Sequence, residues 1–322
     1  MTTAAITLTG LQDSAHKYQK EIATMPVIGA QDTLQYMTPR PGVYGKVTLG
    51  TMTGDFEMGP YKNTRKADAA IKLVPRTLET FLGNDAREFD PNEAWNTIYG
   101  QKFAMGESME NLDITKAVAF YAGKKYGKTL NLHLWDAKYS AVGDTTKDMF
   151  NGFDTIAAKE IEDGNIASVK GNYMDVAEKI TAVNAVDILE DIYLHLDPVL
   201  QNEDTIMYLP KSIYMAYLRA YRGAYPGLIY NNEFKKMSLD VSLGKCTLVP
   251  LVSKEKSPYI QVAPKSNMIY GYGNGEFGKE MIDFKEDLWT TILKAAVIFG
   301  TQYKHIEKEQ LFVAKYHTTQ WE

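Results

Sequence analysis

Three glycines late in the chain have the spacing of a dinucleotide-binding loop. Gly273, Gly275 and Gly278 in "GNGEFG" match G-x-G-x-x-G, and the motif follows the strand-like run "MIY". Such a loop also opens a helix and needs an acidic residue about 20 positions later. Residues 295–300 read "AAVIFG" and contain no acid. We therefore predict a surface turn here and no bound nucleotide cofactor.

Histidine and cysteine form no recognisable metal-binding or catalytic pattern either. The histidines lack the H-x-H and H-x-x-x-H spacings that place two ligands on one metal. The single cysteine, Cys246, lies in the apolar run "KCTLVPLV", which predicts a small buried side chain and not a reactive thiol. We predict no metal, no cofactor and no catalytic residue, and interpret the five histidines as solvated or singly hydrogen-bonded: His16, His133, His195, His305 and His317.

Carboxylates gather in "ILEDIYLHLD", which contains Glu190, Asp191 and Asp197. Acids are expected on the outer face of an amphipathic helix, so this cluster alone indicates no catalysis. Neither G-x-S-x-G nor a P-loop occurs. An enzyme with a scattered active site leaves no spacing signature and stays an alternative, but the pattern favours a structural or binding role.

Composition bounds the class of protein. The 322 residues are 45% hydrophobic and 23% charged, which is typical of a folded globular chain. The net charge of −5 argues against a domain whose main task is to grip phosphates. No run approaches the roughly 18 apolar residues of a membrane helix. With one cysteine and no signal-peptide pattern at the N-terminus, we expect a soluble cytosolic chain.

Tyrosine and methionine are unusually frequent, at 21 and 14 residues. Both types are enriched at protein–protein interfaces. A tyrosine-rich core explains the same excess, and composition alone does not decide between the two.

The elements that would have to position a site indicate a mixed α+β chain. Helices are predicted at 111–127, ending at Gly127, at 145–164 behind a capping box of Thr145 and Asp148, and at 175–196, with a short one at 13–22. A strand at 204–210 leads into a helix at 211–223. Further strands are predicted at 244–252, 257–264 and 266–273, the first two separated by the polar turn "SKEK". The tail, 288–316, is ambiguous, because its first half fits a helix or a β-branched strand by pattern.

Residues 41–83 are the least ordinary segment. Two β-rich arms, 43–58 and 69–82, surround the polar stretch "GPYKNTRKAD". This pattern predicts a long hairpin whose tip has no local core to pack against.

Read together, these segments resemble the major capsid proteins of tailed bacteriophages, of the Hong Kong 97 type, and in particular those of phages that infect Bacteroidetes. The resemblance spans nearly the whole chain. It rests on "TPRPGVYGKVTLGTMTGDFE", "RTLETFLGN" with "FDP", "NGFDTIAAKEI", "DTIMYLPKSIYMAYLRAY", "LGKCTLVPLV", "APKSNMIYGYG" and "FGTQYKHIEKEQLFVAKY".

The resemblance implies an α+β capsid fold in four parts: an N-terminal arm, an extended β-hairpin loop, a peripheral domain with a spine helix, and an axial domain with a mixed sheet. The arm maps to 1–40 and the loop to 41–85. The peripheral domain maps to 86–144 and 286–322, and the axial domain to 145–285. By analogy the ambiguous tail becomes strands, which close the chain as a hairpin.

The resemblance also explains the long hairpin, because a neighbouring copy can bury what the chain itself cannot. The alternative is a hairpin folded back on its own domain. Some relatives cross-link lysine to asparagine between subunits; Lys62, Asn63 and Lys66 lie near the tip, but no motif identifies a partner, so we do not predict that chemistry. The predicted inter-subunit contact residues are Met52, Phe56, Met58, Tyr61, Lys62 and Arg65.

The implied function is that of a non-enzymatic subunit of an icosahedral phage head, forming pentamers and hexamers around double-stranded DNA. The implied partners are further copies, a portal, a scaffold and head-accessory proteins, with DNA contacted non-specifically and no membrane. The expected location is the virion, after assembly in the bacterial cytoplasm. An encapsulin-like nanocompartment shell is the alternative within this fold.

Overall fold

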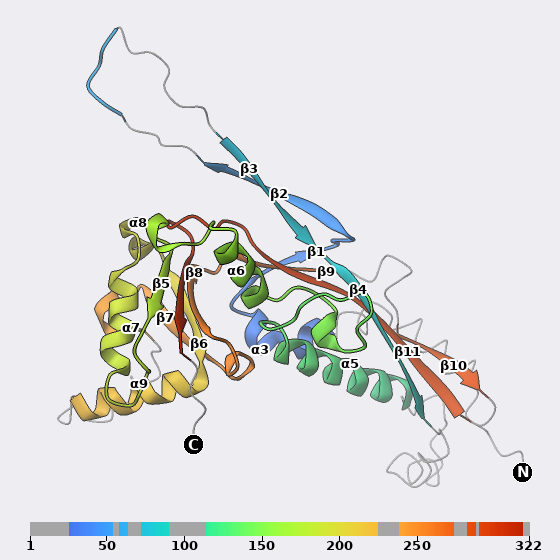
Figure 1. Ribbon diagram of the computed structural model, residues 1–322. Helices are drawn as coiled ribbons and strands as arrows, with labels where there is room; N and C mark the ends of the chain where they lie inside the picture. The colour runs from blue at the N-terminus through green and yellow to red at the C-terminus, as the bar shows by residue number, and fades with distance from the viewer. Residues whose placement is uncertain are drawn as a thin grey trace, which may run out of the picture.

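The computed structural model describes residues 26–53, 58–63, 72–89, 114–224, 238–273, 282–287 and 290–317. They form two five-stranded sheets, a separate two-stranded ribbon that projects from the body, and helices packed around the sheets (Figure 1). The predicted helix at 13–22, and Gly275 and Gly278 of the glycine motif, lie outside these residues.

The first sheet has the order β1-β9-β11-β10, with β4 also paired to β11. β11 is its central strand, antiparallel to β4, β9 and β10, whereas β1 is parallel to β9. Helix α5 (Ile114–Leu132) runs beside this sheet (Figure 1). The strands are β1 (Thr38–Pro41), β4 (Phe81–Phe89), β9 (Met268–Tyr272), β10 (Ile282–Asp287) and β11 (Thr290–Tyr303).

The second sheet has the order β5-β12-β8-β6-β7 and is buried on both faces. On β6, Met207 and Leu209 face one hydrophobic core and Tyr208 faces the other, as the two-residue period of a strand requires. The strands are β5 (Tyr173–Val176), β6 (Thr205–Pro210), β7 (Cys246–Leu251), β8 (Tyr259–Pro264) and β12 (Phe312–Tyr316).

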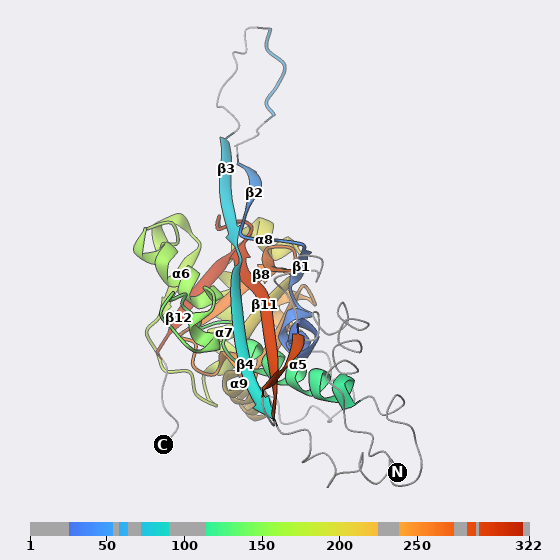
Figure 2. The same cartoon turned by 90° about the vertical axis from the view of Figure 1, so that its right-hand side faces the viewer.

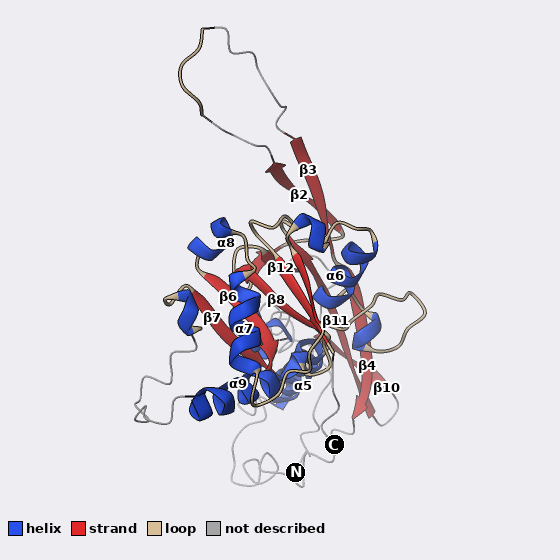
Figure 3. Ribbon diagram, turned by 60° about the vertical axis from the view of Figure 1, so that its left-hand side comes forward, coloured by secondary structure: helices blue, strands red, loops and turns tan. Residues whose placement is uncertain are grey.

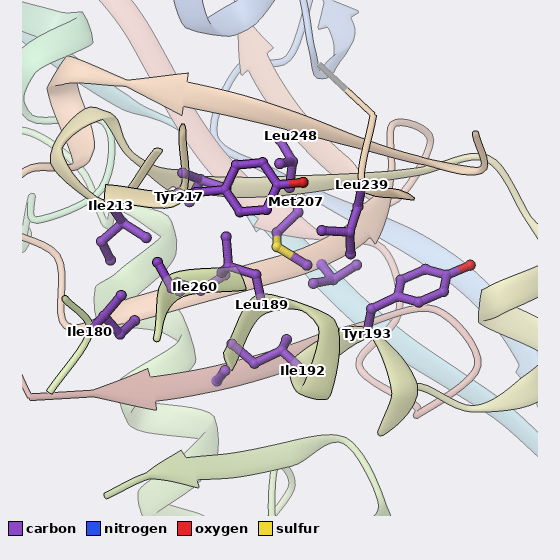
Figure 4. Close-up of a cluster of buried hydrophobic side chains, with 14 of the residues drawn as sticks. Ile180, Leu189, Ile192, Tyr193, Met207, Ile213, Tyr217, Leu239, Leu248 and Ile260 are labelled. Atoms are coloured by element: carbon purple, nitrogen blue, oxygen red, sulfur yellow. The ribbon is translucent and has the colours of Figure 1, made fainter. Parts of the chain in front are cut away.

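Helices cover each face of the second sheet. α7 (Ala185–Leu194) and α9 (Lys211–Ala224) pack on the first core, which contains Leu189 and Ile192 of α7 together with Leu248 and Ile260 of the sheet (Figure 4). The other core contains α6 (Phe153–Glu162), the short α3 (Gln31–Leu34) and the C-terminal end of α5. Figure 3 shows α7 and α9 on the side of β6 and β7, far from β4 and β10. A short helix, α8 (Pro198–Asn202), precedes β6.

Three helix predictions need correction, since the helix predicted at 145–164 begins only at Phe153. Gly127 does not end α5, which continues to Leu132. A Cβ on Gly127 would lie only 2.6 Å from the Cα of Gly29, so this glycine permits a close crossing of two backbones. The helix predicted at 175–196 begins only at Ala185, because Asp175 and Val176 belong to β5, paired with β12. The capping box at Thr145 and Asp148 is confirmed, although it caps a single 3-10 turn before α6.

The predicted polar turn "SKEK" contains a buried charged residue, Lys254. The side chain of Lys254 is fully buried; its Nζ lies 3.0 Å from Asp154 Oδ1 and 3.7 Å from the centre of the Trp135 ring. Gln261 Nε2 donates to the same Asp154 oxygen at 2.8 Å. Burial lowers the pKa of Lys254 to about 8, against the raising effect of Asp154. The partners are about 100 residues apart in sequence, so local pattern could not reveal them.

Asn267 lies where the chain crosses between the two sheets. At this point β8 passes into β9, and β11 passes into β12. Because β11 and β12 lie in different sheets, they do not form the closing hairpin that was predicted for the tail. The strand assignment of both segments is confirmed. The Asn267 side chain donates to the carbonyls of His305 (3.0 Å) and Gln310 (2.8 Å) and accepts from His305 N (2.7 Å). One side chain thus joins both crossings.

Most tyrosines of the two central sheets are core residues. Three donate their hydroxyl protons to buried or half-buried carbonyls: Tyr208 to Tyr36, Tyr303 to Phe153 and Tyr316 to Ser257. Seven tyrosines are buried, which favours the core interpretation for much of the tyrosine excess: Tyr193, Tyr208, Tyr217, Tyr259, Tyr270, Tyr303 and Tyr316. Tyr61, Tyr121 and Tyr139 are exposed.

Replacing Asn267 with Ala is expected to lower the free energy of unfolding by about 2–4 kcal/mol, because it leaves a buried N–H and two carbonyls without partners. Urea unfolding followed by circular dichroism measures this. Asn202→Ala, at an exposed position, is the control and should change the free energy by less than about 0.5 kcal/mol. Equal effects of the two variants would contradict the role assigned to Asn267.

Stability is expected to fall steeply above about pH 10, the ordinary pKa of tyrosine. Burial raises the pKa values of Tyr208, Tyr303 and Tyr316 well above that value, so these groups ionise first in the unfolded chain. Their stabilising contribution is complete below pH 10 and is lost as the pH rises, at about 1.4 kcal/mol per pH unit for each. Urea unfolding at several alkaline pH values measures the slope. Tyr316→Phe should make the slope of unfolding free energy against pH shallower by about 1.4 kcal/mol per pH unit. Tyr61→Phe should leave this slope unchanged.

Candidate inter-subunit surface

The projecting ribbon is an antiparallel hairpin of β2 (Lys46–Thr53) and β3 (Lys72–Glu79), paired from Lys46–Glu79 to Thr53–Lys72. Figures 1 and 2 show it leaving the body as an isolated two-stranded arm. Its root has a small core, in which Leu49 and Leu78 pack with Val43 and Ile269. An isolated two-stranded hairpin is marginally stable in water, so the distal part gains little from its own chain.

Thr80 holds the two strands together at the root. Its hydroxyl donates to the Val43 carbonyl at 3.0 Å and accepts from Gly45 N, also at 3.0 Å. Its own N–H donates to the Gly45 carbonyl at 2.8 Å. Gly45 has a φ of +89°, a conformation that glycine adopts readily and other residues rarely adopt. The root therefore depends on one buried threonine and one glycine.

Two glycines of the first sheet let the root lie directly on the body. A Cβ on Gly300 of β11 would lie 2.1 Å from the Glu79 carbonyl oxygen. A Cβ on Gly271 of β9 would lie 2.9 Å from Thr80 Cγ2 and 3.0 Å from Leu78 Cδ2. The hairpin backbone thus rests on β9 and β11 where no side chain would fit.

Arg76 of β3 fixes the direction of the hairpin. Its Nε donates to the Tyr303 carbonyl at 3.0 Å, and its Nη2 donates to Glu160 Oε1 of α6 at 2.8 Å and to Gln302 Oε1 at 3.0 Å. The Arg76 and Glu160 side chains are only 10% and 15% exposed. A buried, charge-assisted set of bonds to β11 and α6 holds the proximal half of the hairpin in one orientation.

The tip region is exposed where the structure describes it. Met58 is 100% exposed and Tyr61 is 93% exposed, and Lys62 is also exposed. Met52 lies in β2 opposite Leu73. Phe56 and Arg65 lie outside the described residues. The contact role of all six residues stays a prediction.

Sequence reasoning missed Arg76, Thr80 and Lys254. The only local signal for Arg76 was a charged residue inside the strand-like run "LVPRTLE". Its partners come from β11 and α6, far away in the sequence.

The histidines are not gathered into one place. His133 Nδ1 lies 3.0 Å from Asp136 Oδ1, and His195 Nδ1 lies 2.8 Å from the Asp191 carbonyl. Burial lowers the pKa of His305, which lies at the sheet crossing, and His317 is exposed. His16 lies outside the described residues. Within the part of the chain that the structure describes, no three His, Cys, Asp or Glu side chains lie close enough to hold a metal ion.

Cys246 and the acidic cluster have structural surroundings. Burial raises the pKa of Cys246 to about 12, so the nucleophilic thiolate is disfavoured at neutral pH. Asp197 Oδ1 accepts from Val199 N at 2.9 Å as the cap of α8, and Asp197 Oδ2 pairs with Lys308 at 2.8 Å. Burial raises the pKa of Glu190, with Asp187 and Asp240 adding to the effect.

An open groove lies between α5, β4 and the loop that precedes α6. Asp85 is one of the charged residues that line it, and it accepts from the Tyr126 hydroxyl at 2.9 Å and from Arg87 Nε at 2.8 Å. Burial and the bond to Asp85 raise the pKa of Tyr126 to about 12, so this hydroxyl stays a proton donor. The groove therefore holds a satisfied hydrogen-bond cluster around Asp85. Among the described helices, none is both long and apolar enough to cross a bilayer.

Comparison with known proteins gives similarity in structure alone. No protein-family model and no curated protein sequence matches the chain. Among solved structures, it is similar to a chain of the satellite phage P4 procapsid including size determination (Sid) protein, with a TM-score of 0.56, 10% identity, and coverage of 91% of this chain and 90% of that one.

Two further solved capsid structures are similar to this chain. The Cyanophage A-1(L) capsid asymmetric unit gives a TM-score of 0.54 at 12% identity, over 92% of this chain and 94% of that one. The capsid of the native GTA particle gives 0.53 at 11% identity, over 89% and 90%. The chain has the Hong Kong 97-type capsid fold. The predicted α+β fold class is confirmed, whereas nothing in these matches supports a special likeness to phages of Bacteroidetes.

Replacing Arg76 with Met is expected to free the hairpin from the body, because three hydrogen bonds are lost and Glu160 keeps a mostly buried charge. The free energy of unfolding should fall by about 2–4 kcal/mol. Amide hydrogen exchange in β2 and β3 should also accelerate.

Lys46→Met is the matched control on the same hairpin. Lys46 pairs with Glu79 at 3.1 Å on the surface, where such pairs contribute less than about 1 kcal/mol. If the two variants exchange alike, Arg76 does not determine the orientation of the hairpin.

Proposed function

We propose that this protein is the major shell subunit of a tailed-phage head, which assembles into pentamers and hexamers around double-stranded DNA. The observation that carries the proposal is a hairpin anchored rigidly at its root and exposed at its tip, on a chain with the capsid fold over about nine-tenths of its length. No bound cofactor and no catalysis are required for this role.

We propose the following division of the chain into functional parts. The N-terminal arm is 1–40, the extended loop is 41–85, and the axial domain is 145–285. The peripheral domain is 86–144 with 286–322. Because β12 pairs with β5 and β8, the last part of this segment reaches into the second sheet. The pairing suggests that β12 functions with the axial domain.

Self-association through the hairpin has a clear energetic basis. Specific interfaces bury about 800 Å² on each partner. At about 25 cal/mol per Å² of apolar area, half of that is worth several kcal/mol before association costs. Met58 and Tyr61 bury almost no surface in the lone subunit, so their contribution is available only to an assembly.

The other partners follow from the same role. A portal, a scaffold and head-accessory proteins would contact the assembled shell, and DNA would be contacted without sequence preference. The site of assembly would be the bacterial cytoplasm and the final location the virion. A nanocompartment shell, the alternative within this fold, would enclose cargo enzymes instead. Neighbouring genes for a portal, a terminase and a maturation protease would support the phage role, and a cargo enzyme gene would contradict it.

Replacing residues 54–71 with Asn-Gly closes the hairpin directly after the Thr53–Lys72 pair with a favoured two-residue turn. We expect a folded subunit with nearly unchanged thermal unfolding that no longer forms particles, because the tip contributes only between subunits. Light scattering and negative-stain microscopy across salt and protein concentration measure particle formation.

Point variants test the same contact more mildly. Met58→Ser with Tyr61→Ser should reduce particle yield, whereas Val169→Ser, equally exposed elsewhere, should not. A shortened hairpin that still closes shells would refute the contact role. A wild-type protein that stays monomeric under all assembly conditions would refute the shell function itself.

A further inference from the structure

The charge of α5 differs from that of the rest of the chain. The chain has a net charge of −5, yet the 19 residues of α5 include four lysines and no acidic residue. By contrast, α7 carries three acids and no basic residue. Charge is therefore separated between elements, and α5 is locally basic on an acidic protein.

Four exposed side chains of α5, between Tyr121 and Lys128, form a stripe. Lys124, Lys125 and Lys128 are exposed, and Tyr121 is 65% exposed. These positions follow one another at spacings of three, one and three residues, so all four lie on one face of the helix. Leu132, four residues beyond Lys128, is exposed as well. The opposite face packs inward through Leu130 and through Gly127, which crosses Gly29.

Tyr121 and Lys125 belong to the same stripe and contact each other. Lys125 Nζ lies 5.5 Å from the centre of the Tyr121 ring. Lysine ammonium groups and a tyrosine hydroxyl are side chains that contact DNA phosphates without reading sequence. Asp85, which the Tyr126 hydroxyl of the same helix contacts, is also bound by Arg87.

The stripe also lies away from the hairpin. In both Figure 1 and Figure 2 the hairpin leaves one end of the body, and α5 runs along the other end. A surface used by neighbouring subunits and a surface that faces enclosed nucleic acid can therefore be separate on this molecule.

We propose that the α5 stripe of Tyr121, Lys124, Lys125 and Lys128 contacts the phosphates of duplex DNA on the inner face of the shell. This rests on the proposed function and names the part of the subunit that meets the genome. The occupant is DNA because the stripe offers several mobile cations and one aromatic hydroxyl, which suit a uniform row of phosphates. Each contact releases counterions, so binding is salt-dependent and independent of sequence.

The test compares two triple variants of the full-length protein. Lys124→Gln, Lys125→Gln and Lys128→Gln together remove the stripe. Lys170→Gln, Lys211→Gln and Lys256→Gln, at exposed positions elsewhere, change the net charge by the same amount. Binding of a labelled duplex oligonucleotide is measured by fluorescence anisotropy over a range of salt concentrations.

For the stripe variant we expect at least about a tenfold loss of affinity at low salt, and a slope of log affinity against log salt shallower by about three, one for each lysine. The control variant should keep the wild-type slope, and both should form particles by negative-stain microscopy. Equal slopes in the two variants would overturn the proposal and leave the shell function intact.

Loss of particles in the folded stripe variant, with DNA binding unchanged, would also overturn the proposal. That result would assign the stripe to a neighbouring subunit or a scaffold. Failure of the wild-type protein to form particles is a separate result, and it concerns the shell function alone.

Discussion

The crossing at Asn267 is the constraint on which the two-sheet body depends. β8 and β12 pair antiparallel in one sheet, and their continuations β9 and β11 pair antiparallel in the other. The chain must therefore leave one sheet and enter the next twice at the same place. Asn267 satisfies backbone groups of both crossings with one side chain that is itself buried. Without it, buried carbonyls and an N–H would face an apolar interior.

The hairpin depends on this body for its direction. β11 is long enough to pair with β9, β10 and β4 along its length and still present Gly300 to the hairpin root. Tyr303, near the crossing, accepts from Arg76 and donates to the core at Phe153. The hairpin, the first sheet and the core therefore contact one another at Gly300 and Tyr303, near the C-terminal end of β11. A projecting arm can point in a fixed direction because its root is part of the core.

Two buried charge pairs lie in the part of the chain that the structure describes. Lys254 and Asp154 lie in the core with Gln261 and Trp135, and Arg76 and Glu160 lie at the root of the hairpin. Removing one partner of such a pair is costly, because it leaves an uncompensated charge out of water. The lysines of α5 are the opposite case. They are exposed on one face of the helix, where water and counterions solvate their charge until a polyanion displaces the counterions.

The sequence by itself determined much of the local structure. Alternating patterns located β6, β7, β8 and β9, and the helical period located α9, because each depends on neighbours within a few residues. The glycine motif lacks the acidic residue of a nucleotide site, and the apolar arms of residues 41–83 have no local core to pack against. Both observations indicated assembly before any coordinates. The resemblance to capsid proteins supplied the strand assignment of the tail, which periodicity left open.

Only the tertiary structure decided the rest, because the deciding partners are distant in sequence. Gly127 looks like a helix stop until Gly29 is seen against it, and Val176 fits a helical period until β12 pairs with it. Lys254 looks like a solvated turn residue, yet Asp154 and Trp135 bury it. The role of Arg76 likewise follows from its hydrogen bonds to Tyr303 and Glu160, which are distant in sequence. Local pattern records what a residue prefers, and long-range packing determines which preference it satisfies.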